Sequence, residues 1–161
     1  MGPDEYADHV TDSVYTNAGV MQTLSHAAAI GALLGVSPAR LEPWMNASSR
    51  IKIIFDEVLG YHPEFAGYVW PRKVKQADTV MCGFPFEVKH ATFTPQTKAA
   101  DLAAYAAVTD AGGPAMTWGV FAVGYIELGK GFESKAASNF NRSFANAQVR
   151  ERRGWGISDL A

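Results

Sequence analysis

Three carboxylates lie within the first eight residues of the chain, just before a long helical pattern. Asp4, Glu5 and Asp8 follow Gly2-Pro3, which predicts a turn or an extended entry. A carboxylate held where a loop meets a helix is rigid on one side and reachable on the other, which suits a general acid. The same residues could instead cap the helix and oppose its dipole. The residue types alone favour this capping role.

A second polar cluster, residues 74–80, contains Lys75, Gln76 and Asp78 among apolar neighbours. Lys75 carries only donors, and Gln76 offers both donors and an acceptor, so both side chains suit the hydroxyl groups of a sugar. A solvated turn is the commoner role of such a cluster.

The histidines give no metal-binding pattern. His9, His62 and His90 lie close to these two motifs, but no spacing among them matches a known metal site. We therefore expect neither a metal nor another cofactor.

Apolar residues at steps of three and four predict an all-α chain. The predicted helices cover about residues 12–34, 38–50, 95–108, 114–128 and 132–146. Ser37-Pro38 and Thr94-Pro95 have the residue types of an N-cap followed by the first helical position. The first two helices, joined by a short loop, should form an antiparallel hairpin. The short β-branched run 51–55 predicts a brief strand or an extended segment.

The segment 56–70 is rich in aromatic residues, glycine and proline, and predicts an irregular loop. Aromatic faces flanked by polar groups can bind sugars, so the loop could form one wall of a site. It could equally be an aromatic plug over a small satellite core, and the sequence leaves both alternatives open.

The predicted helix 114–128 is apolar nearly all round and should be buried on most faces. Met116 and Trp118 are therefore expected in the core. Glu127 on the same helix needs a partner or a water-filled pocket.

The composition is that of an ordinary globular domain. The chain has 161 residues, of which 48% are hydrophobic and 19% charged, with a net charge of −2. These values argue against disorder, and the lack of a long basic stripe argues against a nucleic-acid partner. No signal peptide or membrane-length apolar run is present, so we expect no membrane partner. The single cysteine, Cys82, excludes an intramolecular disulfide.

Several segments together resemble glycoside hydrolase family 65. They are Gly2–Tyr6, Ala7–Val10, Tyr15–Ala18, Val74–Asp78, Gly113–Trp118, Phe121–Gly124 and Arg142–Asn146. The Ala-Asp-His variant after the N-terminal motif is most similar to the fungal acid trehalases. The resemblance covers residues 1–148, whereas residues 149–161 are basic, contain glycine and do not look like family sequence.

This resemblance implies part of an (α/α)6 barrel, with Glu5 as general acid and with Lys75 and Gln76 near the bound glucosyl unit. Enzymes of the family invert the anomeric carbon, so a second carboxylate must activate water. In the family this base is a Glu shortly after the Arg142–Asn146 segment. Glu151 is the nearest carboxylate here, but its arginine-rich surroundings do not match, and we do not assign it that role.

The implied activity is hydrolysis of the disaccharide trehalose to two glucoses, in a vacuolar or extracellular setting. The alternatives are a family 65 phosphorylase or glucosidase for another α-glucoside, such as a glucosyl-galactosyl unit. From a different class, the chain could be a non-catalytic helical module for sugar binding or assembly.

Prediction: the isolated chain self-associates and does not turn over trehalose. A partial barrel leaves apolar helix faces uncovered, and such faces promote association. Size-exclusion chromatography and a glucose-release assay test this expectation. A monomer that hydrolyses trehalose would contradict both parts.

Overall fold

The regular structure of the chain is helical in the computed structural model, which describes residues 2–113 and 116–145. The elements within those residues are α1 (Val14–Leu33), α2 (Pro38–Ser48), the short 3₁₀ helix η1 (Asp78–Cys82), α3 (Pro95–Val108), α4 (Met116–Leu128) and α5 (Glu133–Ala145). The described residues contain no strand, only isolated bridges such as Val74 with Thr109. The all-α prediction is confirmed, and of the two alternatives for 51–55 the structure shows an extended segment with no partner strand.

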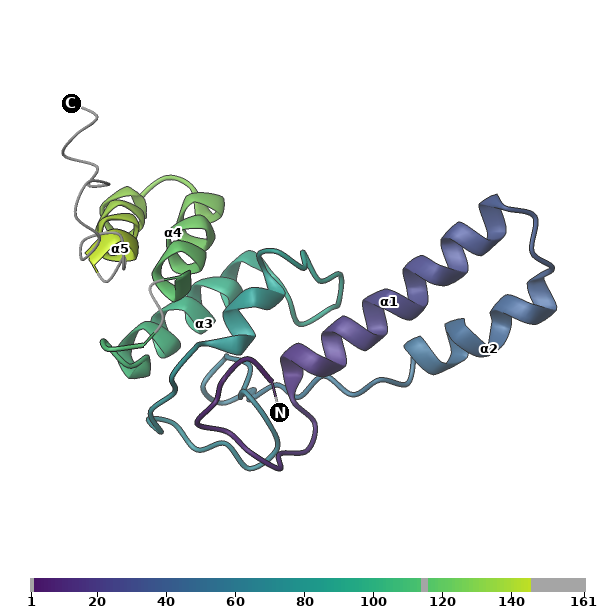
Figure 1. Cartoon of the computed structure of the whole chain (residues 1–161), viewed down its shortest axis with the longest axis horizontal. Coiled ribbons are helices and arrows are strands. Elements are labelled where there is room, and N and C mark those ends of the chain that lie inside the picture. The colour runs from purple at the N-terminus through teal and green to yellow at the C-terminus, as the bar shows by residue number, and fades with distance from the viewer. Residues whose placement is uncertain (1, 114–115, 146–161) are drawn as a thin grey trace, which may run out of the picture.

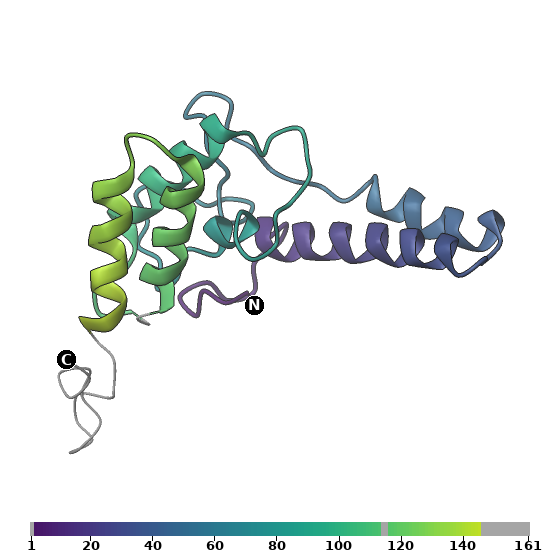
Figure 2. The same ribbon diagram turned by 90° about the horizontal axis from the view of Figure 1, so that it is seen from above.

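Helices α1 and α2 form one antiparallel pair and α4 and α5 form another, as Figure 1 shows. The hairpin of α1 and α2 projects as an arm from a body that holds α3, α4 and α5. Figure 2 shows α4 and α5 packed side by side at the end opposite the tip of this arm. Paired helices of this kind are consistent with part of a helical barrel. None of the described helices combines the length and hydrophobicity that a membrane crossing requires.

Local hydrogen bonds explain where the helices begin. The Thr94 and Thr97 side chains each accept the backbone N–H of the other residue, at 3.2 and 2.8 Å, which is a reciprocal cap for α3. Pro95 then occupies the first turn, as predicted. Beyond the C-terminal end of α1, Gly35 has φ +74°, a conformation that glycine adopts without strain.

The larger core cluster joins the aromatic loop 56–70 to α3 and α4. Tyr61, Phe65 and Tyr68 are buried, and the first and last of these rings pack on Tyr105 of α3. Trp118 lies in the same cluster, as predicted. These three rings therefore form an aromatic plug over the core rather than the wall of a site, whereas Trp70 in the same loop is exposed. The Met116 side chain lies outside what the structure describes.

Apolar side chains also remain on the surface of both helix pairs. The exposed ones on the helices and the turn between α1 and α2 are Val20, Ile30, Leu33, Leu34, Trp44, Met45, Ile126, Phe140 and Phe144. They are the surface on which the predicted self-association depends, and that association stays a prediction.

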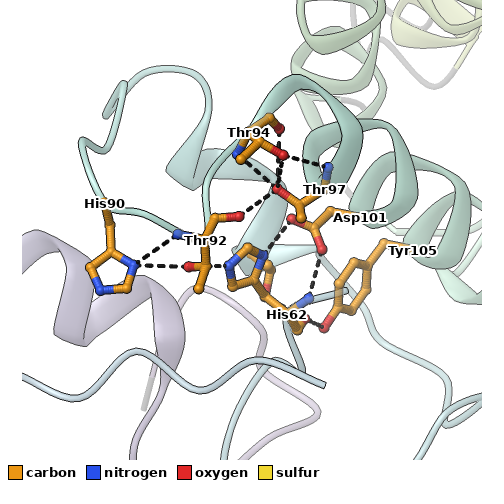
Figure 3. Close-up of polar contacts among 8 residues, drawn as sticks. His62, His90, Thr92, Thr94, Thr97, Asp101 and Tyr105 are labelled. Carbon is orange, nitrogen blue, oxygen red and sulfur yellow. Dashed lines mark hydrogen bonds and ion pairs between the residues drawn. The ribbon is translucent and has the colours of Figure 1, made fainter. Parts of the chain in front are cut away.

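A fully buried histidine connects the aromatic loop to α3, as Figure 3 shows. His62 Nδ1 lies 2.8 Å from Asp101 Oδ2, and its backbone N–H donates to Asp101 Oδ1 at 2.8 Å. Its Nε2 lies 2.8 Å from the hydroxyl oxygen of Thr92, and its ring stacks on Phe93 with centroids 4.1 Å apart. The Tyr105 hydroxyl donates to the His62 carbonyl at 2.8 Å. This network fastens the loop to α3 through buried polar groups, all with partners.

Prediction: His62→Ala destabilises the fold by roughly 3–5 kcal/mol, because it leaves the Asp101 carboxylate buried without its ring partner. Urea unfolding followed by circular dichroism measures the change. His26→Ala on the exposed side of α1 is the matched control and should change stability by less than about 0.5 kcal/mol. Equal effects of the two substitutions would contradict the structural role of His62.

Candidate active site

The structure brings the two polar motifs of the sequence into contact. The buried carboxylate of Asp4 accepts the backbone N–H groups of Lys75 at 2.8 Å and Gln76 at 3.3 Å through one oxygen, Oδ1. The Gln76 side-chain amide donates in return to the carbonyl of Pro3 at 2.6 Å. These bonds hold the N-terminal loop against the segment that starts at Lys75.

That segment is in turn fixed to the end of α3. The Val74 N–H donates to the Val108 carbonyl at 3.1 Å, and the Asp110 N–H donates to the Val74 carbonyl at 2.8 Å. Residues 74 and 76–80 are buried, so the expectation of a solvated turn is wrong. Tertiary contacts override the local polarity of this stretch.

The capping role that the residue types favoured for the N-terminal carboxylates is also wrong. Helix α1 begins at Val14, and the Ser13 hydroxyl caps it by accepting the Thr16 N–H at 3.3 Å. Asp4 and Glu5 lie outside the first turn, so they are available for other roles.

Glu5 and Lys75, both selected from the sequence, form an ion pair. Glu5 Oε2 lies 2.7 Å from Lys75 Nζ, and the Glu5 side chain is 60% exposed. The hydrogen bond that Lys75 donates to the Glu5 carboxylate raises the pKa of Lys75 above its ordinary value. Gln76, by contrast, is buried, and its side-chain amide donates a hydrogen bond to the Pro3 carbonyl. The structure thus places Glu5 at the surface, beside a cation and on a fixed loop.

Tyr6, Lys73 and Asp110 extend this polar surface, although none of them was predicted from the sequence as a site residue. The Tyr6 hydroxyl donates to Asp110 Oδ2 at 2.9 Å, and Lys73 Nζ lies 3.1 Å from the same oxygen. The Gly112 N–H, Lys73 and Tyr6 together lower the pKa of Asp110 to about 2, so it is ionised at neutral pH. The one sequence signal was the Asp110-to-Gly112 spacing of an Asx turn.

Buried carboxyls lie beneath this surface. Glu64 is 1% exposed, and its Oε1 accepts the Asp78 N–H at 3.2 Å. Burial, with the nearby charges of Asp78 and Asp4, raises the pKa of Glu64 to about 9. Burial also raises the pKa of Asp78 to about 7. No group of three or more potential ligands among the described residues is arranged to hold a metal ion.

A cavity of about 310 Å³ lies elsewhere, between η1, α3 and α4. Cys82, Phe93, Lys98 and Glu127 are among its lining residues, whereas Glu5 is not. Glu127 forms an ion pair with Lys98, which confirms the expected need for a partner.

Comparison with known proteins relates the chain to carbohydrate enzymes. It is 44% identical over 146 residues to a protein-glucosylgalactosylhydroxylysine glucosidase from Danio rerio, and 46% identical to the one from Mus musculus. It is 31% identical over 121 residues to an acid trehalase from Emericella nidulans. These matches cover 91% and 75% of the chain respectively. No protein-family model matches the chain.

The chain is related to a segment of glycosidases. It spans 21% and 20% of the two glucosidases and 11% of the trehalase. Identity is higher to the glucosidases than to the trehalase, so the comparisons favour the glucosyl-galactosyl alternative of the sequence analysis. Glu151 and the segment 149–161 lie outside the described residues.

Prediction: the free energy of unfolding falls as the pH rises, and Glu64 causes part of this fall. Its pKa is about 9 in the folded protein, against an ordinary value of 4.5. Between those values the folded state binds the extra proton, so stability decreases with rising pH by at most about 1.4 kcal/mol per pH unit for one proton.

Urea unfolding at pH 7.5 and 8.5 tests this, because the Asp78 contribution is largely complete above its pKa of about 7. Glu64→Gln should flatten the dependence over this interval, and Glu57→Gln, an exposed control, should not. A wild-type slope that survives in Glu64→Gln would contradict the assignment.

Proposed function

We propose that the chain forms the general-acid segment of a glycosidase that removes glucose from a glucosyl-galactosyl unit, with Glu5 as the proton donor. The observation that carries this proposal is the exposed Glu5 carboxylate, paired with Lys75 on a loop that Asp4 fixes from below. The higher identity to the glucosylgalactosylhydroxylysine glucosidases supports this substrate over trehalose.

In the proposed reaction Glu5 gives its proton to the glycosidic oxygen as the bond from that oxygen to the anomeric carbon breaks. Water attacks the same carbon from the opposite face and loses a proton to a second carboxylate. We assign that base to none of the described residues.

In this proposal Lys75 has one role when Glu5 is ionised and another when Glu5 is protonated. It pairs with the ionised carboxylate, as in the structure. When Glu5 carries the proton, the ammonium loses this partner and can donate to a sugar hydroxyl. Tyr6 and Lys73 offer further donors on the same surface, while Gln76 acts mainly by holding the loop.

Trehalose hydrolysis is the second candidate, supported by the 31% identity to an acid trehalase. A non-catalytic sugar-binding module is the third candidate. The three candidate functions predict different activities for a whole enzyme in which this chain replaces the matching segment.

Prediction: this chain restores activity when it replaces the matching segment of the Mus musculus glucosidase, and it does so poorly in the Emericella nidulans acid trehalase. Each chimera is assayed for glucose release from its own substrate, glucosyl-galactosyl-hydroxylysine or trehalose. Glu5→Gln in the active chimera should lower kcat by about 10²–10⁴-fold, the usual contribution of a general acid.

Glu87→Gln, an exposed glutamate on another loop, is the matched control and should leave kcat unchanged. Activity only in the trehalase chimera would favour the second candidate. A folded chimera without activity in either enzyme, or full activity with Glu5→Gln, would favour the third.

A further inference from the structure

The Asp110 carboxylate contacts residues that neighbour both members of the Glu5–Lys75 pair. Its Oδ2 accepts the hydroxyl of Tyr6 at 2.9 Å and lies 3.1 Å from Lys73 Nζ. Tyr6 follows Glu5 directly in the chain, and Lys73 precedes Lys75 by two positions. One carboxylate oxygen therefore joins the N-terminal loop to the segment that carries the cation of the pair.

Asp110 is itself fixed through its backbone and its other carboxylate oxygen. Its N–H donates to the Val74 carbonyl at 2.8 Å, and its carbonyl accepts the Gly113 N–H at 3.0 Å. Its Oδ1 accepts the Gly112 N–H at 2.9 Å. The carboxylate thus meets its partners from a rigid turn, so little conformational entropy is lost when it binds them.

The same turn packs closely against the backbone of Lys75. A Cβ atom on Gly113 would lie 2.6 Å from the Lys75 carbonyl oxygen and 3.0 Å from the Asp110 carbonyl oxygen. Both oxygens belong to the backbone, which cannot rotate away as a long side chain can, so this close approach requires glycine. The position of Asp110 relative to Lys75 is therefore set independently of its contact with Tyr6.

Tyr6 is attached at two points, and Asp110 supplies the outer one. At the inner point the Tyr6 N–H donates to Asp4 Oδ1 at 3.2 Å, and the Ala7 N–H donates to the Asp4 carbonyl at 3.1 Å. Tyr6 is 48% exposed and the Glu5 side chain is 60% exposed, so packing alone fixes neither of them. Polar contacts must set their positions, and a bond to an ionised acceptor is among the stronger ones.

We propose that Asp110 is a positioning residue, which holds the N-terminal loop beside Lys75 by accepting the Tyr6 hydroxyl and pairing with Lys73. This attachment stands on the hydrogen bonds themselves, whereas its catalytic meaning rests on the proposed function of Glu5. Asp110 acts on the acid through Tyr6, the next residue in the chain.

Hydrogen exchange of the whole chain tests the attachment without turnover. Tyr6→Phe and Asp110→Ala each remove the bond between hydroxyl and carboxylate. Each should accelerate exchange of the amides of residues 6 and 7 by roughly tenfold or more. The double variant should exchange no faster than Asp110→Ala alone, because both substitutions remove the same contact.

Asp56→Ala is the matched control. Asp56 also accepts backbone N–H groups within its own turn, from Val58 and Leu59, both at 2.9 Å. Its replacement removes a turn contact of the same kind as the bond from Gly112 to Asp110. We expect it to leave the amides of residues 6 and 7 within about twofold of their wild-type exchange rates.

Three results would overturn the attachment. They are unchanged exchange at residues 6 and 7 in Tyr6→Phe, accelerations that multiply in the double variant, and an equal response to Asp56→Ala. If Asp110→Ala does not fold, Tyr6→Phe still decides the question, because it removes a single hydroxyl group.

The glucosidase chimera then tests the catalytic meaning. Tyr6→Phe and Asp110→Ala should each lower kcat about tenfold and change KM less than about twofold, because a displaced acid lowers the rate more than it weakens substrate binding. Unchanged constants, or a raised KM at constant kcat, would overturn the positioning role. An inactive chimera would refute the proposed function, while the exchange rates would still decide whether Asp110 holds the loop.

Discussion

The Asp4 carboxylate accepts backbone N–H groups from its own loop and from Lys75, 71 positions further along the chain. This shared acceptor is the contact on which the candidate site depends. A buried carboxylate is stable only when donors replace its lost hydration, and here the backbone supplies them. The neighbouring Glu5 therefore sits on a loop whose position is set from below, while its own carboxylate stays in solvent. Rigid support beneath an accessible acid is the arrangement that proton transfer to a bound substrate requires.

The helices matter to this site mainly as anchors. Helix α3 holds the Lys75 segment through Val74 and Asp110, and it holds the aromatic loop through the His62–Asp101 pair. That loop also carries Glu64, whose Oε1 accepts the Asp78 N–H at 3.2 Å. The hairpin of α1 and α2, which projects away in Figure 1, contributes its first turn to this assembly.

Local signals in the sequence were sufficient to predict the helices and some residues of the candidate site. Thr94-Pro95 marks the start of α3 because capping needs only neighbouring residues. The resemblance selected Glu5 and Lys75, and the structure brings these two residues together. The tertiary partners could not be predicted, since nothing local distinguishes a buried Asp4 or Glu64 from a solvated carboxylate. Tyr6 and Asp110 are likewise 104 positions apart, so their hydrogen bond follows only from the fold. The capping role favoured for the N-terminal carboxylates was wrong for the same reason.

The most direct test of Glu5 as a general acid is the dependence on leaving group in the glucosidase chimera. A phenol of low pKa leaves without protonation, whereas a sugar hydroxyl does not. We predict that Glu5→Gln lowers kcat/KM for the glucosyl-galactosyl substrate by about 10²-fold or more. The same substitution should lower kcat/KM for a dinitrophenyl glucoside much less. An equal loss on both substrates would contradict the assignment, because Glu5 would then act in binding or folding rather than in proton transfer.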